Sequence, residues 1–123
     1  MAKKILLIDD NRLTREINGS LLERAGYKTV SAGDGRQGLK ELEEEKIDLI
    51  ILDLVMPDID GFEFLNLYKK NSLTQHIPVI VLTIRDSPQE IERAKRLGAE
   101  ACLIKHKMRP QALLDSVRII LGE

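Results

Sequence analysis

The chain has little of several residue types, and each shortage excludes a class of protein. It has one cysteine among 123 residues, so it forms no intrachain disulfide and is not a disulfide-rich secreted scaffold. It has no tryptophan and only 3% aromatic residues, which leaves no stacking platform for single-stranded nucleic acid. Neither charge dominates, with 19 Lys and Arg against 20 Asp and Glu, whereas nucleic-acid binders are usually basic. Its longest aliphatic runs are four residues, so no segment is predicted to cross a membrane.

What the chain does contain is enough sequence for one domain. Hydrophobic residues make up 43%, sufficient for one core, and no linker, low-complexity tract or internal repeat divides the chain. We therefore expect a single globular domain over residues 1–123. We expect it in the cytoplasm, because no signal peptide or membrane segment is recognisable.

Short aliphatic runs recur at regular intervals along the chain. Residues 4–8, 48–52 and 78–82 each contain four consecutive aliphatic residues without alternation, which is typical of strands buried on both faces of a parallel sheet. Residues 27–32 and 101–104 are two weaker strand candidates. The sequence therefore predicts five strands.

Helical stretches separate these strands. Residues 12–25 and 35–46 have apolar stripes, and a third stripe runs through 62–68. A fourth helix is expected from Ser87-Pro88 to Gly98, and a fifth from Pro110. In the first helix, one apolar face is expected to carry Leu13, Ile17, Leu21 and Leu22.

The regular alternation of strand and helix predicts an α/β fold with helices on both faces of a parallel sheet. Five strands fit the flavodoxin-like order 2-1-3-4-5, in which a crevice lies at the carboxyl ends of strands 1 and 3. We expect functional residues at that edge.

Carboxylates follow both of these strands. Asp9 and Asp10 end the first strand and Asp53 ends the third, so the fold would bring the three side chains together. Like charges raise each other's pKa and destabilise the folded state unless a cation compensates them. The cluster therefore predicts a site for Mg²⁺, which prefers oxygen ligands.

The fourth and fifth strands end in a hydroxyl and an ammonium group. Thr83 and Lys105 occupy these positions and would face the carboxylates across the crevice. A metal and a lysine can neutralise a phosphoryl group while a threonine donates a hydrogen bond to it. The five residues together predict a phosphoryl pocket.

These motifs, at these spacings, resemble the receiver domain of bacterial two-component response regulators. The resemblance runs from about Lys4 to Leu121, and its motifs are Asp9-Asp10, Asp53, the loop Met56-Pro57-x-x-Asp60-Gly61, Thr83, Lys105, Val30 to Gly35 and Leu97-Gly98-Ala99. It implies that Asp53 accepts a phosphoryl group. It also implies that Asp10, Asp53 and the Val55 carbonyl bind Mg²⁺, with Asp9 acting through water, and that Thr83 and Lys105 hold the phosphoryl oxygens.

The resemblance also implies partners. A histidine kinase or a phosphotransfer protein would supply the phosphoryl group, and a downstream protein or output domain would respond to it. Residues 85–109 carry seven Lys and Arg against four Asp and Glu, a charge excess that could serve an acidic partner or a second copy of the domain. Homodimerisation would use the face shared by the fourth helix, the fifth strand and the last helix; no nucleic acid or membrane is expected as a direct partner.

The chain departs from the family pattern at three positions. Ile84 stands where receivers usually have Ala or Gly, Cys102 where they have Tyr or Phe, and His106 where they have Pro. We expect a trans Lys105–His106 bond, because a cis bond before a residue other than proline costs roughly 2.5–4 kcal/mol. We also expect Ile84 to crowd Thr83, and the family's threonine–aromatic switch to be absent.

Two further positions bear on the lifetime of the phosphoryl group. In the family, the residues two after the phosphoacceptor and two after the threonine flank the hydrolytic water, and here they are Val55 and Arg85. Valine offers that water no hydrogen bond, and the arginine is long enough to cover the site. We therefore expect slow self-dephosphorylation.

Alternative functions differ in the residues they need after the first strand. Phosphatases of the haloacid-dehalogenase type need Asp-x-Asp, whereas the chain has Asp9-Asp10-Asn11. A flavin-binding domain would want a loop rich in Ser, Thr and Gly there, and Asn11-Arg12-Leu13 is a poor substitute. A degenerate receiver that acts as a constitutive interaction or dimerisation module stays open.

Overall fold

The structure is a computed structural model that describes residues 2–123, in which strands and helices alternate. The strands are β1 (Lys4–Ile8), β2 (Lys28–Ala32), β3 (Leu49–Leu52), β4 (Val79–Thr83) and β5 (Ala101–Ile104). The helices are α1 (Arg12–Arg24), α2 (Gly35–Glu44), α3 (Gly61–Lys70), α4 (Pro88–Arg96) and α5 (Pro110–Leu121). A 3-10 turn that the sequence did not predict, η1 (Lys105–Lys107), follows β5. Within residues 2–123, no helix combines the length and apolar character needed to cross a membrane.

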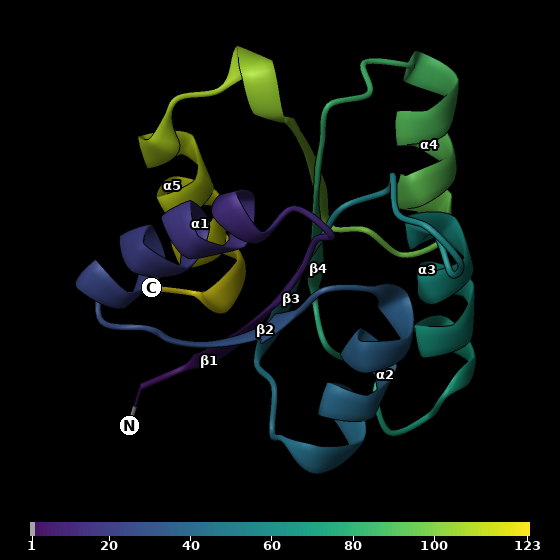
Figure 1. The fold of residues 1–123 in the computed structure, drawn as a ribbon, viewed down its shortest axis with the longest axis horizontal. Coiled ribbons are helices and arrows are strands. Elements are labelled where there is room, and N and C mark those ends of the chain that lie inside the picture. Colours follow the sequence, from purple (N-terminus) through teal and green to yellow (C-terminus); the bar gives the residue numbers. More distant parts are fainter. Residues whose placement is uncertain (1) are drawn as a thin grey trace.

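The strands form one parallel sheet in the order β2-β1-β3-β4-β5. Helices α1 and α5 cover one face, and α2, α3 and α4 cover the other (Figure 1). The predicted flavodoxin-like α/β fold and its strand order are therefore confirmed. Because the strands are parallel, their carboxyl ends meet at one edge, where β1 and β3 are direct neighbours.

Strand residues alternate between two apolar cores. Leu6 and Ile8 of β1 pack in the core beneath α2, α3 and α4, whereas Ile5 and Leu7 pack in the core beneath α1 and α5. The same alternation holds in β3 and β4. The aliphatic runs are continuous because both faces of the sheet are covered.

Side chains at the carboxyl edge fix where four of the helices begin. Asn11, Asp34, Asp60 and Ser87 are N-caps, and each accepts a hydrogen bond from the backbone N–H three residues further on. Ser87 followed by Pro88 is the helix start expected from the sequence. These caps hold the first turns of α1, α3 and α4 around the ends of β1, β3 and β4.

The apolar face predicted for α1 is right for Leu21 and Leu22, which pack against the core, but wrong for Leu13 and Ile17. Leu13 and Ile17 are 64% and 59% exposed, whereas Leu22 is fully buried. Leu13 and Leu22 are nine positions apart. At about 3.6 residues per turn that is close to two and a half turns, so the two side chains lie on opposite sides of the helix. Gly19 and Leu22 face the sheet instead.

Candidate functional site

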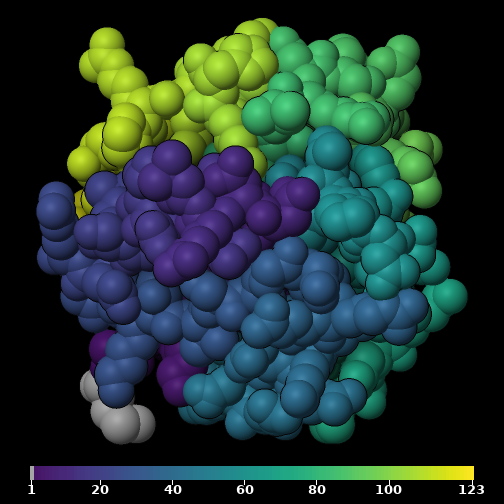
Figure 2. Space-filling view, in the orientation of Figure 1, coloured from purple at the N-terminus to yellow at the C-terminus, as the bar shows by residue number. Residues whose placement is uncertain are grey.

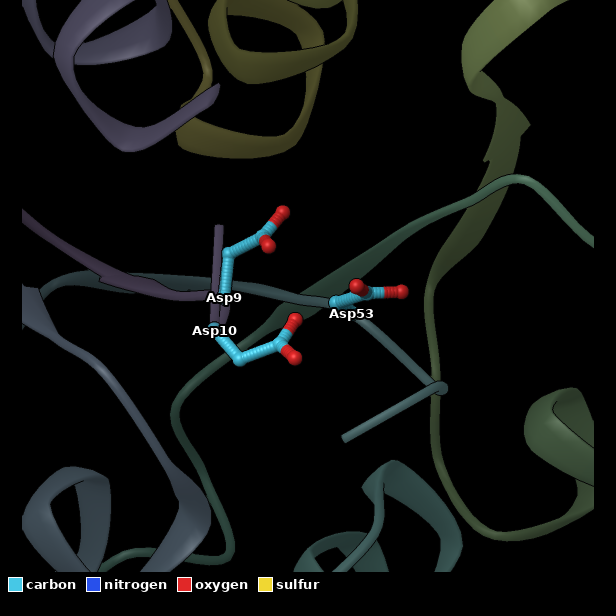
Figure 3. Close-up of side chains that lie close together, drawn as sticks. All are labelled: Asp9, Asp10 and Asp53. Carbon is cyan, nitrogen blue, oxygen red and sulfur yellow. The ribbon is translucent and has the colours of Figure 1, made fainter. Parts of the chain in front are cut away.

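The carboxylates of Asp9, Asp10 and Asp53 form a cluster at the carboxyl edge of the sheet (Figure 3). One oxygen from each lies within 4.8 Å of the others. The sheet itself brings them together: the Asp53 N–H donates to the Ile8 carbonyl at 3.0 Å, which joins the end of β3 to the end of β1. Asp9 and Asp53 are buried, and Asp10 is exposed at the rim.

Backbone N–H groups hold the two buried carboxylates. The Asn11 N–H donates to Asp9 Oδ1 at 2.9 Å, and the Val55 N–H donates to Asp53 Oδ1 at 3.2 Å. The Arg15 guanidinium, which the sequence analysis missed, donates to the backbone carbonyl of Asp9. The one feature of the sequence that could have identified Arg15 is its place in the first turn of α1, shortly after Asp9 and Asp10. The carboxylates are thus oriented from the backbone of their own loops.

Lys105 is the cation of the site. Its Nζ lies 2.8 Å from Asp9 Oδ2 and 3.5 Å from Asp53 Oδ2, and its side chain is 19% exposed. Lys105 opens η1, and no cis peptide bond occurs in residues 2–123, so the expected trans bond before His106 is confirmed. The side chain therefore reaches the carboxylates from a 3-10 turn.

Charge in the cluster is unbalanced. Three carboxylates share one lysine, so the fully ionised cluster carries a formal excess of two negative charges. Burial raises the pKa of the Asp53 carboxyl; the Lys105 ammonium and the Val55 N–H oppose this shift, and Asp9 adds to it. Ionised Asp53 is therefore disfavoured by its surroundings, and a dication would relieve this.

Thr83 is fully buried at the end of β4, next to β3 in the sheet. Its Oγ1 accepts a hydrogen bond from the Arg85 N–H at 3.2 Å, and a threonine hydroxyl can also donate. The expected crowding by Ile84 is wrong, because Ile84 is 60% exposed and points away from the core. Ile84 follows the last residue of β4, so its side chain lies beyond the end of the sheet and belongs to neither core.

A cleft lies beside the cluster, between the segment after β3 and the start of α4. Its volume is about 250 Å³, and its lining includes Val55, Phe62, Arg85, Glu90 and Arg93. The Arg85 Nη1 pairs with Glu90 Oε2 at 2.9 Å, and the Arg93 guanidinium lies 4.2 Å from the Phe62 ring centroid. The position of Arg85 near the site is expected from its place two residues after Thr83, whereas its ion pair with Glu90 is not.

Cys102, at the position where an aromatic residue was expected from the resemblance, is half-buried in β5. Its Sγ lies 4.0 Å from the Ile91 carbonyl oxygen, a weak contact with α4. Burial raises the pKa of its thiol. It is a small side chain packed between β5 and α4.

The sequence model of the response regulator receiver domain matches residues 5–118. The chain belongs to this family. Receiver domains of two-component systems interact with histidine kinases and with downstream targets, and the carboxyl edge of the sheet carries the acidic site of the family. The segments that surround this site in the present receiver meet on one face of the molecule (Figure 2).

Curated relatives of this receiver differ in length. The polar-differentiation response regulator DivK of Brucella anthropi is 29% identical over 123 residues, which cover 100% of this chain and 99% of DivK. The phosphate regulon transcriptional regulatory protein PhoB of Klebsiella pneumoniae is 31% identical over 121 residues, 98% of this chain but 52% of PhoB. A gliding motility regulatory protein of Myxococcus xanthus is 31% identical over 114 residues, 93% of this chain and 15% of that protein.

Solved structures similar to this receiver include the chemotaxis protein CheY4 of Vibrio cholerae. It has a TM-score of 0.91 and 32% identity, and the match covers 98% of this chain and 99% of CheY4. The receiver domain of a sensor histidine kinase from Pseudomonas aeruginosa, with a magnesium ion coordinated in its active-site cleft, has a TM-score of 0.89 and covers 100% of each chain. At 23% identity, that structure supports the fold alone.

Proposed function

We propose that residues 1–123 form one receiver domain in which Asp53 accepts a phosphoryl group. The observation that carries this proposal is the buried Asp53 carboxylate, fixed by the Val55 N–H and flanked by Lys105 and two further carboxylates. A carboxylate is a weak nucleophile, but phosphoryl transfer depends mainly on positioning and on charge stabilisation. The Val55 N–H supports the positioning of Asp53, and Lys105 supplies part of the charge stabilisation, which a bound cation would complete.

The residues of the cluster fit Mg²⁺. They offer carboxylate oxygens within 4.8 Å of one another, two of them buried, and their excess charge equals that of a dication. We assign Asp10, Asp53 and the Val55 carbonyl as its protein ligands, with Asp9 acting through water. When bound, Mg²⁺ would neutralise phosphoryl oxygens beside Asp53.

The transfer itself breaks one bond and forms another. An Asp53 carboxylate oxygen attacks the phosphorus of a phosphohistidine, the nitrogen–phosphorus bond breaks, and its electron pair stays on the imidazole nitrogen. Lys105 would move from Asp9 and Asp53 to a phosphoryl oxygen, and the Thr83 hydroxyl would donate to another. The Val55 N–H keeps the carboxylate aligned during the transfer.

The phosphodonor would be a histidine kinase or a phosphotransfer protein. Leu13 and Ile17, exposed on α1, line a groove of about 580 Å³ together with Met108, Pro110 and Lys105. Lys105 also contacts Asp53, so a protein seated on this groove lies beside the acceptor. A partner with an apolar helix face fits it, and we propose the cytoplasm as the meeting place.

Output would use the face formed by α4, β5 and α5. All four residues of the edge strand β5 are partly exposed, and Ile119 of α5 presents an exposed apolar side chain. A downstream protein, an output domain or a second copy of this chain could cover these groups. Nucleic acid and membrane are not proposed as direct partners.

Cys102 favours a second candidate function. Where an aromatic side chain is replaced by a small thiol, the chain could act as a receiver that no longer switches and only binds partners. The two functions differ in one respect: the first requires phosphorylation of Asp53, and the second does not.

Intact-mass analysis with acetyl phosphate separates them. The wild-type chain with Mg²⁺ should gain one phosphoryl group, and Asp53→Asn should gain none. Asp58→Asn is the matched control, because Asp58 is exposed and has a φ of 65°, a conformation that asparagine tolerates well. An adduct that survives in Asp53→Asn or in EDTA contradicts the assignment, and a wild-type chain without adduct supports the degenerate receiver.

A further inference from the structure

Arg85 is held by a weak partner at the rim of the cleft beside Asp53. Its Nη1 lies 2.9 Å from Glu90 Oε2, but the Arg85 side chain is half-exposed, and exposed pairs contribute little stability. The adjacent acid, Asp86, is already paired with Lys107 of η1. Glu90 is therefore the one acid that an ion pair joins to Arg85 within residues 2–123.

The backbone of Arg85 is tied to the candidate site. Its N–H donates to Thr83 Oγ1 at 3.2 Å, and Thr83 ends the strand next to β3, which precedes Asp53. Neighbouring strands lie about 4.8 Å apart. Arg85 also lines the same cleft as Val55, whose N–H holds Asp53 Oδ1. The Arg85 guanidinium thus lies in a cleft that Val55, two residues after Asp53, also lines.

We propose that Arg85 is a phosphoryl-binding residue that exchanges partners when Asp53 is modified. In the unmodified chain the guanidinium pairs with Glu90, and in the phosphorylated chain it crosses the cleft to the phosphoryl oxygens. A phosphoryl group carries more charge than a carboxylate and matches the planar fork of arginine, so it outcompetes the carboxylate of Glu90, whose side chain is 26% exposed. This inference rests on the proposed phosphorylation of Asp53.

Glu90 has a second partner within reach when Arg85 leaves. Ser87 and Glu90 have the spacing of a capping box, and the Glu90 N–H already donates to Ser87 Oγ at 3.3 Å. In residues 2–123 the reciprocal bond, from the Ser87 N–H to the Glu90 carboxylate, is not formed, and Glu90 Oε2 accepts a hydrogen bond from Arg85 Nη1 instead. The exchange would complete the box and so carry the modification of Asp53 to the first turn of α4, without an aromatic side chain at Cys102.

The test uses beryllofluoride as the phosphoryl mimic, with Mg²⁺, at low salt. The chain has no tryptophan, so binding is followed by ¹⁹F NMR of the bound fluorines. Arg85→Gln should shift one bound resonance and weaken apparent affinity about tenfold, the loss of one charge-assisted hydrogen bond. Arg96→Gln is the matched control, since Arg96 is exposed in the last turn of α4 and does not line the cleft, and it should change neither the resonance nor the affinity.

A double-mutant cycle then separates partner exchange from general electrostatics. Glu90→Gln removes the competing partner and should tighten beryllofluoride binding, by about fivefold at most. If it acts only by removing a negative charge, it should tighten binding equally in the Arg85→Gln background. Partner exchange instead predicts that Glu90→Gln changes beryllofluoride affinity by less than about 1.5-fold in the Arg85→Gln background, because the two residues are coupled.

The outcomes are distinct. Arg85 exchange is supported if the cycle is non-additive and if beryllofluoride slows hydrogen exchange at the Ser87 amide in wild-type but not in Glu90→Gln. It is overturned if Arg85→Gln behaves like Arg96→Gln or if the cycle is additive, while wild-type binding still depends on Asp53. If the wild-type chain binds no beryllofluoride, or if Asp53→Asn binds it equally, both the proposed function and the exchange are wrong.

Discussion

Gly61 is the position where the fold and the candidate site are most tightly joined. It is the first residue of α3, and its N–H donates to the Leu54 carbonyl at 3.1 Å. A Cβ at this position would lie 2.6 Å from both the Asp53 carbonyl oxygen and Leu54 Cα. Both are backbone atoms, so Gly61→Ala must move either α3 or the chain that carries Asp53.

Gly19 provides the opposite case on α1. A Cβ there would lie 3.5 Å from Leu7 Cδ1, an ordinary van der Waals contact. Alanine in a helix interior is favoured over glycine by roughly 0.5–1 kcal/mol, so Gly19→Ala should stabilise the fold by about that amount. For Gly61→Ala the clash dominates, and overpacking of this kind typically costs about 1–3 kcal/mol.

Urea unfolding of the two variants measures both effects in free energy, and thermal unfolding gives a second reading. Gly19→Ala should raise the midpoint, and Gly61→Ala should lower it, by about 4 °C per kcal/mol. Gly61→Ala should also weaken beryllofluoride binding, because Asp53 moves, whereas Gly19→Ala should not. A Gly61→Ala chain as stable as wild type would refute the steric reasoning.

Three further predictions concern the titrating and solvent-facing residues. Burial raises the pKa of Asp53, so the folded chain holds that proton more tightly and stability falls as pH rises through this pKa. Asp53→Asn should therefore raise the free energy of unfolding at neutral pH in metal-free buffer; an unchanged value in urea titrations would contradict this. Val55→Asn should shorten the half-life of the phosphorylated chain several-fold by intact mass, because it gives the attacking water a hydrogen-bond partner. Burial also raises the pKa of Cys102, so iodoacetamide should alkylate the folded chain more slowly than the urea-unfolded chain, with a rate that keeps rising to higher pH.

The sheet and the acidic cluster could be predicted because short-range patterns determine both. A continuous aliphatic run identifies a doubly covered strand, and the alternation of strands with helices fixes the order that makes β1 and β3 neighbours. Asp9 and Asp53 follow those strands directly, so their proximity required no knowledge of side-chain packing. The trans bond after Lys105 also followed from local chemistry.

The features that the sequence could not predict depend on the rotation of a helix about its axis and on ion pairs between residues of different loops. Leu13 is exposed because α1 turns Gly19 and Leu22 toward the sheet. A search for apolar residues alone does not find this face, because one of its residues is glycine. Ile84 is exposed because it follows the last residue of β4 and belongs to neither core. The partner of Arg85 depends on the path of the loop before α4, because Asp86 is nearer in sequence than Glu90 but pairs with η1.

The start of α1 makes this sheet edge unfavourable for a nucleotide phosphate. In related folds, free N–H groups at a helix N-terminus bind phosphate. Here the Asn11 side chain occupies the Thr14 N–H, and Asp9 and Asp10 place negative charge directly before the helix. An anion at this edge therefore needs cations, and Lys105 alone does not balance three carboxylates. On the proposed function, binding of Mg²⁺ and of the phosphoryl group must strengthen each other, because thermodynamic coupling between two ligands is reciprocal.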